Sequence, residues 1–162
     1  MGLRRGASVA QLEALYRERY DRFARVAGGI VGDGETGRDA VQHAFAVAIR
    51  ERRSFRAEGS LEGWLWRIVL NEARRMASAH RALPLSEGYE ASTNGHPADE
   101  YGLRAWIATL PERQRAVLFL RYQADMQYSR IADVLGIDVG TVSATLSAAH
   151  TKLRKAMTEA ER

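Results

Sequence analysis

The chain of 162 residues contains no cysteine. This absence excludes disulfide bonds, thiolate zinc sites and cysteine nucleophiles, and nothing else calls for an oxidising compartment. No run of about 18 apolar residues occurs, so we expect a cytoplasmic protein with no membrane insertion. Lysine is also scarce, because 22 of the 24 basic residues are arginine. The guanidinium group is always charged and can donate two hydrogen bonds to a phosphate or a base, so this composition suits an anionic partner.

Motifs of catalytic and cofactor sites are missing as well. The four histidines are scattered, and none has a second histidine or a carboxylate at the spacing of metal ligands. A glycine-rich stretch at residues 28–34 has no lysine followed by serine or threonine, and it follows a predicted helix instead of a strand. It therefore does not match a phosphate-binding loop. We expect no enzymatic activity, no cofactor and no metal site.

Charge divides the chain into three parts. Residues 1–82 carry a net charge of +5, residues 83–100 carry −4, and residues 101–162 carry +3. The middle part has no basic residue, two of the three prolines and no apolar periodicity, which is typical of a linker. We predict two small domains, 1–82 and 101–162, joined by a flexible acidic linker at residues 83–100.

Apolar residues at spacings of three and four predict helices throughout, and no segment alternates as a strand does. The first helix is expected from about Val9 to Ile30, with the glycine-rich stretch ending it. A second helix carries Phe45 on its apolar face, and a third helix follows Ser60. The predicted fold class is therefore all-α.

The third helix carries polar side chains that suit an unstacked single strand. Arg67, Asn71 and Arg74 recur at three- and four-residue spacings, so they can share one face, with Arg75 beside them. Guanidinium groups bind phosphates and an amide reads base edges, while aromatic rings provide stacking surfaces. The same row of arginines is also compatible with an ordinary solvated helix face.

Two tryptophans lie at the start of this helix. Trp64 falls on the apolar stripe and is expected in the core. Trp66 is compatible with either the core or the strand-binding face, and we include it among the candidate DNA-binding residues.

The second domain ends in a helix-turn-helix pattern. A short helix is predicted at residues 129–135, then a turn that contains Gly136, then a longer helix from Val139 to about Met157. In this motif the second helix enters the major groove and its N-terminal residues face base edges. The candidate contacts on that helix are Val139, Gly140, Thr141, Ser143, Ala144 and Thr145, with basic support from Arg130 and Lys152. None of the six is charged, so bidentate reading of guanine by arginine or lysine is not available there.

Three segments in this order resemble the extracytoplasmic-function (ECF) sigma factors of bacterial RNA polymerase, reduced to sigma regions 2 and 4. The segments are Gly32-Asp33 with Asp39-Ala-Val-Gln42-His-Ala-Phe45, then Gly59-Ser60 through Trp64-Leu-Trp66-Arg67 to Asn71, then Leu110-Pro111 through Ile131-Ala132-Asp133-Val134-Leu135-Gly136 to Val142. Together with the helices between them, they cover most of the chain outside the linker and the two ends.

The resemblance implies a transcription initiation factor. It implies that the second helix docks on core RNA polymerase through Asp39, Gln42 and Phe45. It further implies that the first domain captures the melted, single-stranded non-template strand of promoter DNA, and that the second domain reads the upstream promoter element as a duplex. The residues it assigns to strand capture are Arg53, Arg56 and Ser60 on or near the loop before the third helix, and the polar face of that helix.

A regulatory anti-sigma factor is a further partner that the resemblance implies. The alternative hypothesis is a sigma-like protein that binds a protein partner, for example as an anti-sigma decoy, and has weakened DNA contacts.

Overall fold

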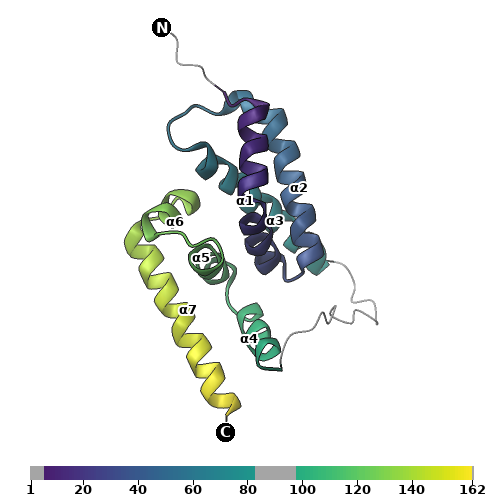
Figure 1. Ribbon diagram of the computed structural model, residues 1–162. Coiled ribbons are helices and arrows are strands. Elements are labelled where there is room, and N and C mark those ends of the chain that lie inside the picture. Colours follow the sequence, from purple (N-terminus) through teal and green to yellow (C-terminus); the bar gives the residue numbers. More distant parts are fainter. Residues whose placement is uncertain (1–5, 83–97, 162) are drawn as a thin grey trace.

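The computed structural model describes residues 6–82 and 98–161, and all regular elements in these ranges are helices (Figure 1). The first domain consists of α1 (Val9–Val31), α2 (Gly34–Glu51), the short 3-10 helix η1 (Arg52–Ser54) and α3 (Leu61–Ala82). The second consists of α4 (Ala98–Ala108), α5 (Glu112–Tyr122), α6 (Tyr128–Leu135) and α7 (Val139–Ala160). The all-α prediction is confirmed. Most of the predicted linker, residues 83–97, lies outside the described residues, and its last three residues belong to α4.

Helix α1 passes through the first two glycines of the glycine-rich stretch. It begins at a capping box formed by Ser8 and Gln11 and ends only at Gly32, whose φ of 89° is the left-handed conformation that favours glycine. The expectation that Gly28 helps to end the helix is therefore wrong. A Cβ atom on Gly37 of α2 would lie 2.4 Å from the backbone nitrogen of Gly28. These two glycines instead let α1 and α2 approach each other closely.

Aromatic side chains form the centre of the first domain, where α1, α2 and α3 lie side by side (Figure 1). The ring of Phe23 lies 4.4 Å from that of Trp66 and 5.7 Å from that of Phe45, measured between centroids. Phe23 and Trp66 are completely buried. The two rings therefore join α1 to α3 by packing that removes large apolar areas from water.

The second domain contains the predicted helix-turn-helix. Helices α6 and α7 are bent by 102° at their junction, within the range expected for this motif. Gly136 makes the turn with a φ of 65°, and Ile131, Val142 and Leu146 fill the space between the helices. No single helix in the described ranges is long and apolar enough to cross a membrane.

The two domains contact each other along two helix pairs. Helix α5 packs against α1, and α6 packs against α3, while α7 runs along the outer side of the second domain (Figure 1). The N-terminal half of α3 is therefore next to α6.

Candidate nucleic-acid interface

A cavity of about 440 Å³ opens where the loop after η1 meets the start of α3. Its walls in the first domain come from residues of the loop and of the first two turns of α3. The members relevant to binding are Phe55, Arg56, Ser60, Trp64 and Arg67. The remaining wall belongs to α6 of the second domain, through Arg130, Asp133 and Val134. The cavity combines aromatic surface with guanidinium and hydroxyl groups, as a site for an unstacked base requires.

The aromatic wall of this cavity is made by Trp64 and not by Trp66. Trp64 is only partly buried, and its ring centroid lies 5.7 Å from that of Phe55. Trp66 is completely buried against Phe23, so its ring is not available to a base. The prediction that Trp66 belongs to the strand-binding face is wrong. The expectation that Trp64 belongs to the core holds in part, because its ring packs against the core and also lines the cavity. The spacing already held the signal, because Trp64 lies three residues before Arg67, on the side of the helix that the polar row occupies.

The polar row of α3 is placed as predicted. The side chains of Arg67 and Asn71 are exposed, and Arg74 is partly exposed. Arg75 is exposed but forms an ion pair with Glu72 on the same helix, with an N···O distance of 2.8 Å. The three aligned residues thus extend from the cavity along one side of α3.

The loop residues assigned to strand capture have different surroundings. Arg53 and Arg56 are exposed. The hydroxyl oxygen of Ser60 accepts a hydrogen bond of 2.9 Å from the backbone nitrogen of Gly63. Ser60 therefore caps the start of α3, and this structural role accounts for a serine at that position without any ligand.

Helix α2 presents only part of the predicted polymerase-docking set. Asp39 and Gln42 are exposed on the outer face of the helix. Phe45 is 6% exposed and packs edge-on against Tyr16, with ring centroids 4.8 Å apart. Because its ring lies in the core of the first domain, the prediction that Phe45 contacts a partner directly is wrong.

The six residues predicted to face DNA on α7 carry no charge, and only some of them are exposed to solvent. The exposed members of the predicted set are Val139, Gly140, Ser143 and Ala144. Thr141 and Thr145 are half-buried, and the hydroxyl of Thr145 donates a 2.7 Å hydrogen bond to the carbonyl of Thr141. Lys152 is exposed two turns further on, whereas Arg130 of α6 reaches the first domain, where it donates a 3.0 Å hydrogen bond to the hydroxyl of Ser60.

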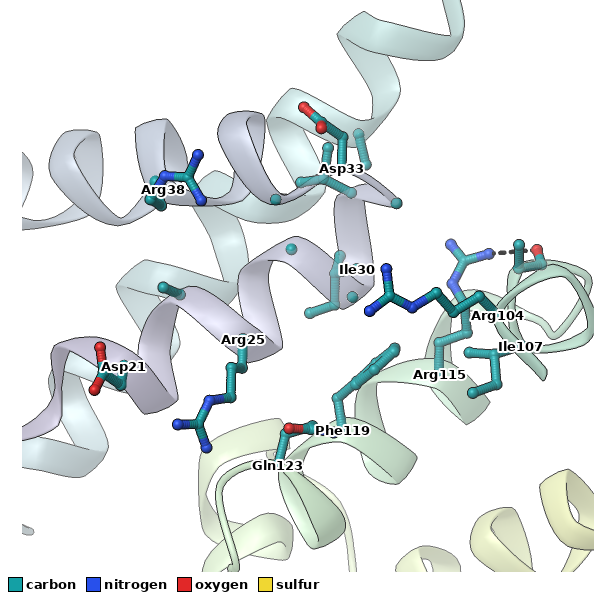
Figure 2. A pocket seen from close by; sticks show the side chains of 18 of the residues that line it. Asp21, Arg25, Ile30, Asp33, Arg38, Arg104, Ile107, Arg115, Phe119 and Gln123 are labelled. Carbon is teal, nitrogen blue, oxygen red and sulfur yellow. Dashed lines mark hydrogen bonds between the residues drawn. The ribbon is translucent and has the colours of Figure 1, made fainter. Parts of the chain in front are cut away.

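A second, larger cavity of about 850 Å³ lies between the α1–α2 turn and helices α4 and α5. Four arginines line it, namely Arg25, Arg38, Arg104 and Arg115. Figure 2 shows Arg104 and Phe119 directed into the space between the two domains. Both domains contribute walls, so the cavity exists only while they are in contact. In the described ranges, no group of three or more histidine or acidic side chains is placed to hold a metal ion.

Models of known families match both domains. Sigma-70 region 2 matches residues 15–82, and Sigma-70 region 4 matches residues 102–153. The RNA polymerase sigma factor YlaC of Bacillus subtilis is 28% identical over 160 residues, which cover 91% of this chain and 92% of that protein. The ECF RNA polymerase sigma factor SigM of Mycobacterium tuberculosis is 31% identical over 150 residues, which cover 88% of this chain and 75% of that protein. The chain belongs to the ECF sigma factors.

Two solved sigma-factor structures share the fold of this ECF sigma factor. CnrH, in complex with the cytosolic domain of CnrY, has a TM-score of 0.71 at 21% identity and covers 96% of this chain and 92% of that one. RpoE from Bartonella quintana, in complex with the anti-sigma factor NepR, has a TM-score of 0.69 at 19% identity, with coverages of 93% and 98%. In this sigma factor α3 therefore lies in region 2 and the helix-turn-helix lies in region 4, and the cavity in front of α3 is lined by both regions.

Proposed function

We propose that this sigma factor recruits core RNA polymerase to promoters, captures the melted non-template strand with region 2 and positions the complex on the upstream duplex with region 4. The cavity in front of α3 is the observation that carries the proposal. Trp64 and Phe55 offer it aromatic surface, and Arg67 stands at its edge. Its volume of about 440 Å³, to which the wall from α6 contributes, falls in the range of small-ligand pockets.

The chemistry of promoter opening matches these groups. Taking a base out of the duplex costs a few kcal/mol. Stacking on an aromatic ring returns about 1–3 kcal/mol per base, and Arg56 and Arg67 can bind the flanking phosphates. Such a site stabilises the open promoter without making or breaking a covalent bond, so the protein needs no catalytic residue or cofactor.

Region 4 contributes position more than base reading in this proposal. The exposed face of α7 offers small side chains such as Ser143 and Ala144 but no charge, and phosphate contacts orient a protein on the duplex without specifying the sequence. Lys152 is the basic residue of the predicted set on this helix. We expect weak duplex binding by the free chain and a strong dependence on polymerase.

Polymerase docking is assigned to α2 through Asp39 and Gln42, which are exposed side by side on the outer face of the first domain.

We place the protein in the cytoplasm. We also expect an anti-sigma factor as a second partner, since the matched RpoE is bound to the anti-sigma factor NepR and the matched CnrH is bound to the cytosolic domain of CnrY. The family matches do not favour the alternative of a sigma-like decoy that has lost its DNA contacts.

Transcription with purified core polymerase tests this function. We expect promoter-dependent run-off transcripts from genomic fragments, with start sites that share upstream elements. An exposed residue outside the predicted binding sets provides a control: Glu13→Gln on α1 should leave the yield unchanged. The absence of any transcript above that of core polymerase alone would refute the proposal.

A further inference from the structure

The larger cavity, between the α1–α2 turn and helices α4 and α5, has a basic lining. Four arginines and two aspartates border it, which leaves a net charge of +2. None of these six side chains belongs to the sets assigned to DNA or to polymerase. The excess of positive charge is therefore not explained by the contacts of the proposed function.

The two aspartates leave arginines of the cavity without a partner. Asp33 caps α2, where its carboxylate accepts a 2.8 Å hydrogen bond from the backbone nitrogen of Thr36, and Figure 2 shows it directed away from the second domain. The side chains of Asp21, Arg25 and Arg38 form no ion pair or hydrogen bond with another described residue. Unpaired cations that border a concave surface concentrate positive potential there and attract anions.

Arg115 is fixed at the opposite wall of the cavity. Its Nη1 donates hydrogen bonds of 3.0 Å and 3.2 Å to the backbone carbonyls of Ala108 and Leu110, at the end of α4 and just after it. Its Nη2 has no partner among the described residues. Arg104 of α4 is directed into the same space (Figure 2). A guanidinium group that is already oriented loses less side-chain freedom when a ligand binds.

Contacts between the domains hold the walls of the cavity in position. Arg67 on α3 donates a 2.7 Å hydrogen bond to the backbone carbonyl of Asp133 on α6. Nε of Arg74 on α3 lies 2.6 Å from a carboxylate oxygen of Glu112 on α5. A site whose walls are already in place needs little reorganisation to bind a ligand.

Size and chemistry indicate the class of ligand. The volume of about 850 Å³ falls in the range of small-molecule sites and is much larger than one phosphate group needs. The arginines come from four different helices, so a chain of linked phosphates matches their distribution better than a single anion does. The planar guanidinium group suits phosphate, to which it can donate two hydrogen bonds. The ring of Phe119, which packs against Gly29 of α1, adds apolar surface beside the cations.

We propose that this cavity is a polyphosphate-binding site that regions 2 and 4 build jointly, for a small ligand that carries two or three linked phosphates. Arg25 and Arg38 bind it from region 2, and Arg104 and Arg115 bind it from region 4. A ligand that contacts both regions binds only the chain in which they are in contact, so it stabilises that arrangement by mass action. The site shares no residue with the proposed DNA-binding and polymerase-binding sets, so the two proposals can fail separately.

Isothermal titration calorimetry of the full-length chain tests the site, with inorganic triphosphate as the ligand and no divalent cation present. Arg25→Gln and Arg104→Gln each remove one charge from one wall. Arg17→Gln on α1 and Arg113→Gln on α5 are the matched controls, because both arginines are exposed and lie outside the cavity lining. Circular dichroism verifies that each variant keeps its helices.

We expect saturable binding of one triphosphate per chain. Arg25→Gln and Arg104→Gln should each weaken it about tenfold, since each removes a hydrogen bond to a charged group, whereas both controls should bind as the wild type does. The midpoint of thermal unfolding should rise with the triphosphate concentration in the wild type and rise less in the two cavity variants.

A nucleotide and an inorganic polyphosphate are distinguished by ATP and adenosine. If the ligand is a nucleotide, ATP should bind at least about fivefold more tightly than inorganic triphosphate, because its base can stack on an aromatic ring, and Phe119→Leu should remove that difference. Equal binding of the two identifies the phosphate chain alone as the ligand. Adenosine should not bind in either case.

Four results would overturn the proposal. The first is the absence of saturable binding of both triphosphate and ATP. The second is an equal loss of affinity in all four arginine variants, which indicates diffuse attraction to a basic chain. The third is a loss in Arg25→Gln without one in Arg104→Gln, or the reverse, which confines the site to a single region. The fourth is binding of adenosine as tight as that of ATP.

Discussion

Gly37 should be far less tolerant of a side chain than its neighbour Gly34. In Gly37→Ala the new Cβ would lie 2.4 Å from the nitrogen and 2.5 Å from the Cα atom of Gly28, and 3.1 Å from the carbonyl carbon of Ala27. All three are backbone atoms, so no side chain can rotate away. Helices α1 and α2 would have to separate by roughly 1 Å to restore ordinary contact, and a gap of that size loses a quarter to a half of the dispersion energy of the atoms that line it.

The magnitude follows from two opposing effects. Overpacking of this kind costs about 1–3 kcal/mol, whereas replacing glycine by alanine within a helix returns up to about 1 kcal/mol. We expect Gly37→Ala to destabilise region 2 by about 1–2 kcal/mol, which lowers the midpoint of its thermal unfolding by roughly 5–15 °C for a domain of this size.

Circular dichroism at 222 nm during thermal and urea unfolding measures this change. Gly34→Ala is the control, because a Cβ there meets only the flexible end of Arg38 at 3.7 Å, and its stability should stay equal or rise slightly. If Gly37→Ala proved as stable as the wild type, or if both variants lost stability equally, close packing of α1 on α2 would not explain the glycine-rich stretch.

Three further predictions concern the DNA-binding surfaces. Trp64→Ala should weaken binding of forked promoter DNA by the polymerase complex by about 1–3 kcal/mol in a fluorescence-anisotropy titration. Trp66→Ala should instead lower the free energy of unfolding by about 3–5 kcal/mol. The reverse pattern would contradict the assignment of the two rings. Asn71→Ala should slow open-complex formation in stopped-flow measurements while leaving polymerase affinity unchanged, and an equal loss of both would indicate a structural role. Ala144→Arg, on the exposed face of α7, should raise duplex affinity and steepen its salt dependence by about one counterion; an unchanged slope would mean that this face of α7 does not meet DNA.

The order of helices could be predicted from the sequence because each depends on local information. Spacings of three and four predicted α1 from Val9 to about its last turn, and the pattern around Gly136 predicted the helix-turn-helix with ends close to those of α6 and α7. The separate roles of the glycines at residues 28–34 could not be predicted in this way, because Gly32 ends α1 whereas Gly28 lies within it. A glycine that ends a helix and a glycine that admits a neighbouring helix look alike until the neighbour is known.

The contacts of single aromatic residues could be predicted only in part. Trp64 and Trp66 are two positions apart, so they point to different sides of α3, and Trp64 shares its side with the polar row; the contact between Trp66 and Phe23 depends on how α1 packs on α3. The apolar periodicity of α2 placed Phe45 on the buried face, whereas the family resemblance assigned it to a partner, and its ring packs against Tyr16. Both outcomes depend on contacts between residues that are distant in the chain.

By itself the sequence determined an all-α chain, two basic domains with an acidic segment between them, and membership in a family of transcription initiation factors. The tertiary structure decided which groups are free to act. It placed Trp64 in the cavity, buried Trp66 and Phe45, and paired Arg67 and Arg74 with region 4. The reason is physical: helical periodicity fixes how side chains are arranged around one axis, but burial and pairing are set by how separate helices pack against each other.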